Sequence, residues 1–320
     1  MFQSRQLKKS RLLLQKNQMS KSIYIGDVHF NCGGFERYVD AALFSILNIV
    51  KNEKPDEVIF LGDFLDTPTL NPDVAKKMAE WFYQFQQCAE KVFLITGNHD
   101  KLPRYKTPAT AFLEEQGIFT CFNTHTDLNK ILVSHSHSGQ HVENVDGKIV
   151  AAHLGMSGVQ VTAGYEYSND DVLTYTGRPR AIILGHIHTP SDAIREGIPV
   201  YIPGNICPCN WSDSSEQRHI IKVTDSDITM IPFYHIRTKT VYSARDVAGE
   251  PNTIYRLVAA EDEIEKVEDS NQLQSVVIQK KVKPVIKGMT KDTLISLYCK
   301  RAGVDEMNVR KLLLEAGVHA

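Results

Sequence analysis

The sequence predicts an α/β fold in which helices lie on the faces of a central sheet. Short apolar runs alternate along the chain with longer segments whose apolar residues recur every three or four positions. This is the pattern of strands alternating with amphipathic helices. The chain has 320 residues, of which 42% are hydrophobic. It is therefore long enough for one large core and a smaller appended unit.

The elements follow one another in order through the first two thirds of the chain. Residues 22–25 predict a buried strand, and the apolar positions between Phe35 and Val50 recur at helical spacing. Residues 57–61 and 91–96 predict two more strands, and Pro72 opens a helix between them. Four further apolar runs, each short enough for a strand, end at His135, His153, Gly185 and Ile202.

Composition divides the chain into four parts. Residues 1–20 are polar and basic, and we expect a disordered leader there. The alternating pattern defines a main domain over residues 21–225. Short strands around an acidic run predict a small α+β capping region over residues 226–283. Residues 284–320 predict a helical pair, because Thr290 and Asp305 stand as capping residues before two amphipathic segments.

Charge and cysteine usage limit the functional classes. The first 21 residues carry a net +6 and residues 280–320 a net +5, which leaves −13 for residues 22–279 within the total of −2. Such an acidic body is not typical of a free-standing nucleic-acid binder, although the basic ends can assist one or simply aid solubility. No apolar run reaches the roughly 18 residues of a membrane span. Six scattered cysteines and no secretory pattern favour a cytoplasmic setting.

Polar motifs that begin with glycine follow the first two strands. In Gly26-Asp27-Val28-His29, the carboxylate and the imidazole lie on the same side of an extended chain, where both can reach one cation. The motif Gly62-Asp63-Phe64-Leu65-Asp66 follows the second strand, and the two oxygens of Asp63 can bridge two metals. A glycine before each aspartate permits close approach of the backbone.

Two further motifs complete the series. Gly97-Asn98-His99-Asp100 offers a neutral oxygen ligand in Asn98, and His99 stands beside it. Gly185-His186-Ile187-His188 supplies two imidazoles that can face neighbouring cations. A single motif of this kind arises by chance, and a lone histidine is more often structural. Four motifs in order, each at a strand end, predict a metal site, because a core does not accept unpaired carboxylates.

The series GDVH, GDFLD, GNHD and GHIH resembles the signature of the calcineurin-like metallophosphoesterases over residues 22–205. The resemblance implies a four-layer α/β/β/α sandwich and makes residues 21–225 the catalytic domain. It also implies two divalent metal ions, for which manganese is favoured and iron or zinc are the alternatives. One metal is then held by Asp27, His29, Asp63 and His188, and the other by Asp63, Asn98, His186 and one further histidine.

The resemblance also suggests the supporting roles. His99 is expected to stabilise the transition state or to protonate the leaving group, and Asp66 and Asp100 to orient the ligands. The further ligand is His153 or His135, since both end apolar strands. The family pattern favours His153, which follows a strand that supplies no ligand and precedes a turn containing glycine. An accessory metal cluster around His135 is a weaker alternative to a solvated polar loop.

Within this superfamily, the sequence is similar to the nuclease subunits of SbcCD-type complexes that repair DNA double-strand breaks, including phage recombination endonucleases. The run 62–72 reads GDFLDTPTLNP, and the run 200–205 reads VYIPGN before another strand. The similarity implies exo- or endonuclease action on DNA. It also implies a coiled-coil ATPase partner that docks on the helical pair, and a homodimer as a further expectation. Packing of the helical pair on its own domain is the alternative.

Two departures keep a second enzymatic function open. Asn205 stands where a small residue is usual, and the polar run 211–216 replaces an aromatic–acid pair. The alternative is a small-molecule or nucleotide phosphodiesterase or phosphatase of the same superfamily. A phosphoprotein phosphatase is disfavoured because Thr67, and not arginine, follows GDFLD. A partner-binding subunit with a vestigial site is disfavoured because the ligand set is complete.

Overall fold

The computed structural model describes residues 21–101, 107–157, 160–161, 165–166, 172–211, 213, 216–243, 246, 250–259, 273–278, 305 and 307. The predicted leader lies outside these residues, and so do the two helices predicted after residue 284, apart from Asp305 and Met307. Among the described helices, none has the length and apolarity needed to cross a membrane.

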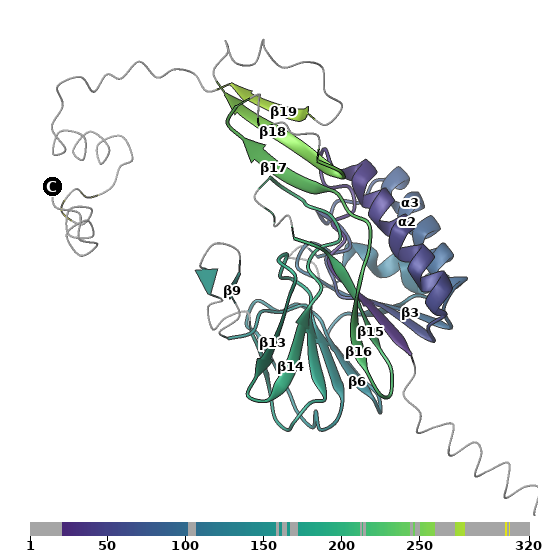
Figure 1. Ribbon diagram of the computed structural model, residues 1–320. Helices are drawn as coiled ribbons and strands as arrows, with labels where there is room; N and C mark the ends of the chain where they lie inside the picture. Colours follow the sequence, from purple (N-terminus) through teal and green to yellow (C-terminus); the bar gives the residue numbers. More distant parts are fainter. Residues whose placement is uncertain are drawn as a thin grey trace, which may run out of the picture.

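Two six-stranded sheets form the centre of the molecule (Figure 1). In the first sheet, β1 to β4 are parallel, and β15 and β16 continue it as antiparallel strands. Its order is β16 (Ile228–Pro232), β15 (His219–Val223), β1 (Ser22–Ile25), β2 (Glu57–Phe60), β3 (Lys91–Ile95) and β4 (Phe119–Cys121). The strands predicted at 22–25, 57–61 and 91–96 therefore lie side by side.

The second sheet has a parallel centre and antiparallel edges. Its order is β13 (Ser191–Arg195), β14 (Ile198–Ile202), β12 (Ala181–Leu184), β8 (Ile149–Ala152), β6 (Lys130–Val133) and β5 (Thr124–Thr126). All four apolar runs predicted to end between His135 and Ile202 are strands of this sheet.

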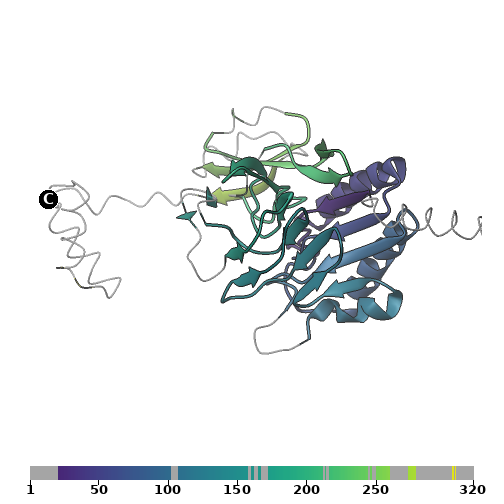
Figure 2. The ribbon, with the colours of Figure 1, turned by 90° about the horizontal axis from the view of Figure 1, so that it is seen from below.

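The central strands read as continuous apolar runs because both of their faces are buried. In β1, Ile23 and Ile25 pack toward the helices, whereas Tyr24 points into the core between the sheets. Helices α2 (Glu36–Glu53) and α3 (Pro72–Gln86) cover the outer face of the first sheet (Figure 2). The side chain of Asn71 caps α3 by accepting a hydrogen bond from the Val74 amide.

The predicted α/β class is confirmed. The outer face of the second sheet packs, within the described part of the chain, on loops and on the strands β7 (Gln140–Val142) and β11 (Leu173–Tyr175). A short 3-10 helix (Ala109–Gln116) follows β3, and the strands β9 (Gln160–Val161) and β10 (Tyr165–Glu166) form a separate hairpin.

The segment after β16 forms a small parallel sheet of its own (Figure 1). It contains β17 (Arg237–Val241), β18 (Thr253–Ala259) and β19 (Leu273–Ile278). Because β16 pairs with β15, the first central sheet continues past the predicted boundary at residue 225. The division into catalytic and capping parts remains a prediction.

Candidate metal centre

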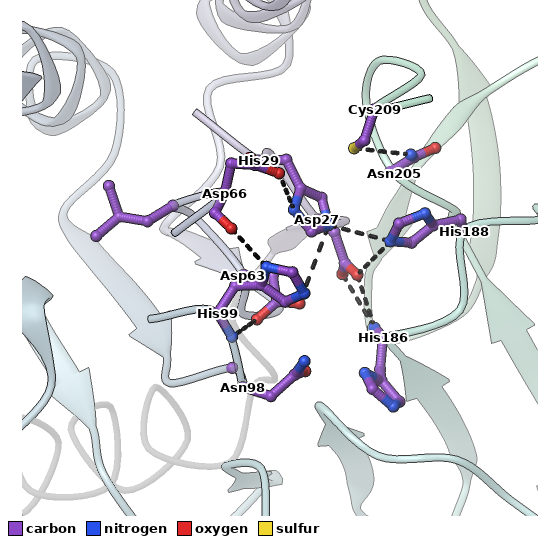
Figure 3. A network of polar contacts seen from close by, with 12 residues as sticks. Asp27, His29, Asp63, Asp66, Asn98, His99, His186, His188, Asn205 and Cys209 are labelled. Carbon is purple, nitrogen blue, oxygen red and sulfur yellow. Dashed lines mark hydrogen bonds and ion pairs between the residues drawn. The ribbon is translucent and has the colours of Figure 1, made fainter. Parts of the chain in front are cut away.

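Five strand ends bring the predicted motifs together. Parallel strands share one carboxyl edge, and the polar side chains that follow these strands converge on one another (Figure 3). The motifs begin within two residues of the ends of β1, β2, β3, β8 and β12. The structure gathers all seven predicted ligands at this edge: Asp27, His29, Asp63, Asn98, His153, His186 and His188.

The first group of ligand atoms comes from the first, second and last motifs. The Nε2 atoms of His29 and His188 face each other at 3.0 Å. Carboxylate oxygens of Asp27 and Asp63 lie 3.9 Å from the Nε2 atoms of His188 and His29, respectively. Two imidazole nitrogens and two carboxylates thus converge on one position, as the resemblance implies.

The second group is built around His153. Its Nε2 lies 3.0 Å from Asn98 Oδ1 and 3.3 Å from Asp63 Oδ2. The ring of His186 is 5.0 Å away between centroids, and ligand atoms of Asp63, His153 and His186 all lie within 4.8 Å of one another. Asp63 belongs to both groups, in the bridging place that its motif predicts.

The structure places His153, and not His135, among the donors. His153 is fully buried, and its Nδ1 donates a hydrogen bond of 2.8 Å to the carbonyl oxygen of Leu61. With Nδ1 bonded to this carbonyl, Nε2 is the ring atom that faces the other ligands and that would bind a metal ion. The His135 ring lies 6.1 Å from that of His153, and His135 joins none of the donor clusters found in the described residues.

Electrostatics favour a cation at this place. Burial alone lowers the pKa of His153, but the charges of Asp63 and Asp27 outweigh it and raise the pKa to about 10. Burial raises the pKa of Asp63, yet His153, His29 and His99 hold it well below its usual range. Buried carboxylates that favour a positive charge on the neighbouring groups, together with imidazole and amide ligands, fit divalent metal ions.

Glycines at two motifs let the backbone approach the ligands. Gly62 has φ +110°, and a Cβ atom there would lie 2.3 Å from His153 Nδ1. A Cβ atom on Gly97 would lie 2.1 Å from Asp63 Oδ1. Neither position can hold a larger residue without displacing a donor. The close approach predicted for Gly62 is therefore observed.

The three residues predicted to support the site all contact the metal ligands or the loops that carry them. Asp66 Oδ1 lies 3.4 Å from His29 Nδ1, and the backbone oxygen of Asp66 pairs with His99 Nδ1. The backbone amide of His99 donates to Asp63 Oδ1 at 2.7 Å. Asp66 and His99 therefore orient ligands of the first group.

Asp100 has a different structural role. It is fully buried and accepts hydrogen bonds from the amides of Leu65 (3.0 Å) and Gly97 (2.9 Å). Burial and the charge of Asp63 raise its pKa to about 7. Asp100 thus ties the second motif to the third without adding a donor to either group.

The loop after β14 contributes residues that the sequence did not single out. Asp213 Oδ1 lies 3.4 Å from His188 Nδ1, and its Oδ2 accepts a 2.7 Å bond from the Cys209 amide. Burial raises the pKa of Asp213, but His188 holds it well below its usual range. The buried Arg218 donates to the carbonyl oxygens of His188 (2.8 Å) and Asn205 (3.0 Å), so it fixes the loop. Asp213 falls in the polar run that we noted only as a departure.

The thiol of Cys209 lies on this loop, and the thiol of Cys32 contacts it from another loop. The sulphur of Cys209 lies within 4.8 Å of ligand nitrogens of His29 and His188, and Cys32 Sγ donates to the Cys209 carbonyl oxygen at 3.1 Å. Hydrogen bonding with Cys32 and burial raise the pKa of the Cys209 thiol above its usual range. No sequence signal marked either cysteine.

A cavity of about 260 Å³ lies next to the second group. Among the described residues, its lining contains no carboxylate and consists of Thr96, Gly97, Asn98, Lys101, Phe122, Asn123, His135, Ser136, His137 and Gln140.

Comparison with known families agrees with this geometry. A calcineurin-like phosphoesterase family model matches residues 21–190, which is more than half of the chain. The match begins at β1 and includes every donor of both groups. No curated protein matches the chain.

Proposed function

The chain belongs to the calcineurin-like phosphoesterase family, and on that premise we propose that it is the nuclease subunit of a DNA recombination or repair complex. Its general enzyme class is that of the metal-dependent phosphoester hydrolases. The proposed substrate is a DNA phosphodiester, and the proposed partner is a coiled-coil ATPase of the SbcC type.

The side chains at the site suit phosphoester hydrolysis. Two divalent cations held by the two donor groups would polarise a phosphoryl oxygen and lower the pKa of a water molecule. His99 is positioned for the proton: its Nδ1 pairs with the Asp66 carbonyl oxygen, which leaves Nε2 as the ring atom that can pass a proton to the departing oxygen. The hydrogen bond from the backbone amide of His99 to Asp63 keeps that ring beside the metal ligands.

The observation that carries the DNA assignment is the lining of the cavity beside Asn98. Residues 22–279 carry a net charge of −13, yet no carboxylate is among the described residues that line the cavity. Lys101 supplies a cation and Phe122 an apolar ring. A phosphate next to the scissile one can pair with such a cation, and a base can stack on such a ring. The similarity of residues 62–72 and 200–205 to SbcCD-type nucleases points to the same substrate.

Cleavage assays test this proposal. With manganese, the purified chain should cleave single-stranded and duplex DNA oligonucleotides in addition to bis-p-nitrophenyl phosphate. It should cleave DNA faster with the ATPase partner present. Hydrolysis confined to free nucleotides, sugar phosphates or phosphoproteins, with DNA left intact, would identify the alternative small-molecule or protein phosphatase.

The cavity predicts which residue distinguishes DNA from a small substrate. Lys101→Ala should lower kcat/KM for DNA about 10-fold, the effect of losing one charge-assisted contact, and should leave bis-p-nitrophenyl phosphate nearly unaffected. Lys91→Ala is the matched control, because Lys91 begins β3 at the opposite edge of the sheet and its side chain is largely exposed. Equal losses on both substrates in Lys101→Ala would contradict the role of the cavity.

The partner assignment rests on the similarity of the chain to SbcCD-type subunits and concerns residues outside the described part. Truncation after Lys283 should abolish co-elution with the ATPase on size exclusion and preserve hydrolysis of bis-p-nitrophenyl phosphate. Undiminished co-elution would place the docking surface elsewhere. A truncated chain that no longer folds would show that the helical pair packs on its own domain.

A further inference from the structure

We propose that Cys209 is a ligand of the metal ion held by His29 and His188, and that its thiolate makes this position select zinc or ferrous iron over manganese. The proposal rests on the two-metal centre of the proposed hydrolase and is independent of which phosphoester is cleaved. It adds a sulphur donor to the first group and leaves the second group with oxygen and nitrogen donors.

The distances allow the three side chains to share one ion. The Nε2 atoms of His29 and His188 are 3.0 Å apart, and Cys209 Sγ lies within 4.8 Å of the ligand nitrogens of both (Figure 3). Zinc binds sulphur at about 2.3 Å and nitrogen at about 2.0–2.1 Å. A sulphur and a nitrogen bound to one zinc ion can thus be at most about 4.4 Å apart, which is close to the 4.8 Å within which these atoms lie.

The surrounding polar groups hold Cys209 and His188 as a unit. Asp213 accepts the Cys209 amide at 2.7 Å through Oδ2, and its Oδ1 lies 3.4 Å from His188 Nδ1. One carboxylate therefore holds the His188 ring and the backbone of Cys209 together, as outer partners commonly do around a metal site.

Asn205 helps to hold the Cys209 side chain in position. It is fully buried, and its side-chain amide donates to Cys209 Sγ at 3.4 Å and to Asp213 Oδ2 at 2.9 Å. The thiol loses its proton when it binds a metal, so metal binding at this position releases a proton.

The two metal positions then differ in chemistry. Soft thiolate ligands favour zinc and iron, whereas carboxylate and carbonyl ligands suit manganese. In the described residues, the cluster around Asp63, His153 and His186 contains no thiol. The centre is therefore expected to hold two different metals when both are supplied, with the softer one beside Cys209.

Cobalt substitution provides the test, with Cys32 as a matched control. Cys32 is buried, and its sulphur forms a cluster with Asp66 and Cys209, but it joins neither donor group. Chelator-treated full-length chain reloaded with Co²⁺ should show a near-ultraviolet thiolate-to-cobalt charge-transfer band. The band should persist in Cys32→Ser and disappear in Cys209→Ser and Cys209→Ala. Zinc affinity at one of two positions should fall at least about 10-fold in both Cys209 variants, and manganese affinity should change less.

The possible outcomes distinguish failure of the Cys209 proposal from failure of the metal centre itself. Two bound cobalt ions without a charge-transfer band, or a band that survives in both Cys209 variants, would overturn the proposal and leave the hydrolytic centre standing. A chain that binds no cobalt at all would overturn the metal centre and the proposal with it. Circular dichroism of each variant establishes that the compared chains are folded.

Discussion

Asp63→Asn is expected to remove both metal ions and to lower kcat/KM for a phosphodiester at least about 10³-fold, which corresponds to about 4 kcal/mol of transition-state stabilisation. The Asp63 carboxylate lies 3.9 Å from His29 Nε2 and 3.3 Å from His153 Nε2, so it serves both donor groups. Asparagine keeps the shape of the side chain but has one oxygen and no charge. Elemental analysis and steady-state kinetics on the same preparations measure the effect.

The control is Asp73→Asn, which makes the same chemical change at an exposed position in the first turn of α3. It should retain two metals and full activity. An Asp63→Asn chain that keeps both metals, or whose kcat/KM falls less than 10-fold, would show that Asp63 does not bridge the centre.

His153→Ala is expected to remove one of the two metal ions and to lower kcat/KM about 10²- to 10³-fold, the usual effect of losing one preorganised electrostatic group. Without His153 the second group keeps Asn98, His186 and the shared Asp63 carboxylate, a smaller set that holds a divalent ion less tightly. Metal content and kinetics are again the measurements.

His135→Ala is the informative comparison, because His135 ends the neighbouring strand and offers the same side chain. Its ring lies 6.1 Å from that of His153, on the cavity side. The His135→Ala variant should keep both metals and lose at most the substrate contact that His135 makes in the cavity. Loss of a metal in His135→Ala and not in His153→Ala would reverse the assignment.

Most of the fold follows from the sequence because the central strands are buried on both faces. Strands such as β1 and β12 are uninterrupted apolar runs, and a glycine-led polar motif follows each of them directly. Parallel pairing then brings those motifs to one edge without further information. The first four motifs could be predicted for this reason.

The contested histidine needed the tertiary structure. His135 and His153 follow similar apolar strands, and the local sequence favours His153 only through the glycine-containing turn that follows it. What distinguishes His153 is its hydrogen bond to the carbonyl of Leu61, which lies 92 residues earlier in the chain. Such a contact has no signature in the local pattern.

The loop between β14 and β15 was the hardest part to predict. Cys209 and Asp213 lie in an irregular segment with no periodicity, and their partners, His188 and Cys32, come from other loops. The boundary at residue 225 illustrates the same limit: β16 has an apolar pattern that fits either unit, and only its pairing with β15 places it in the first sheet.

Anomalous X-ray scattering from crystals grown with manganese and zinc tests the two-metal centre most directly. We predict two peaks about 3.5–4 Å apart on either side of the Asp63 carboxylate. One should lie among Asp27, His29 and His188, and the other among Asn98, His153 and His186. A single peak, or peaks away from Asp63, would contradict the two-metal centre.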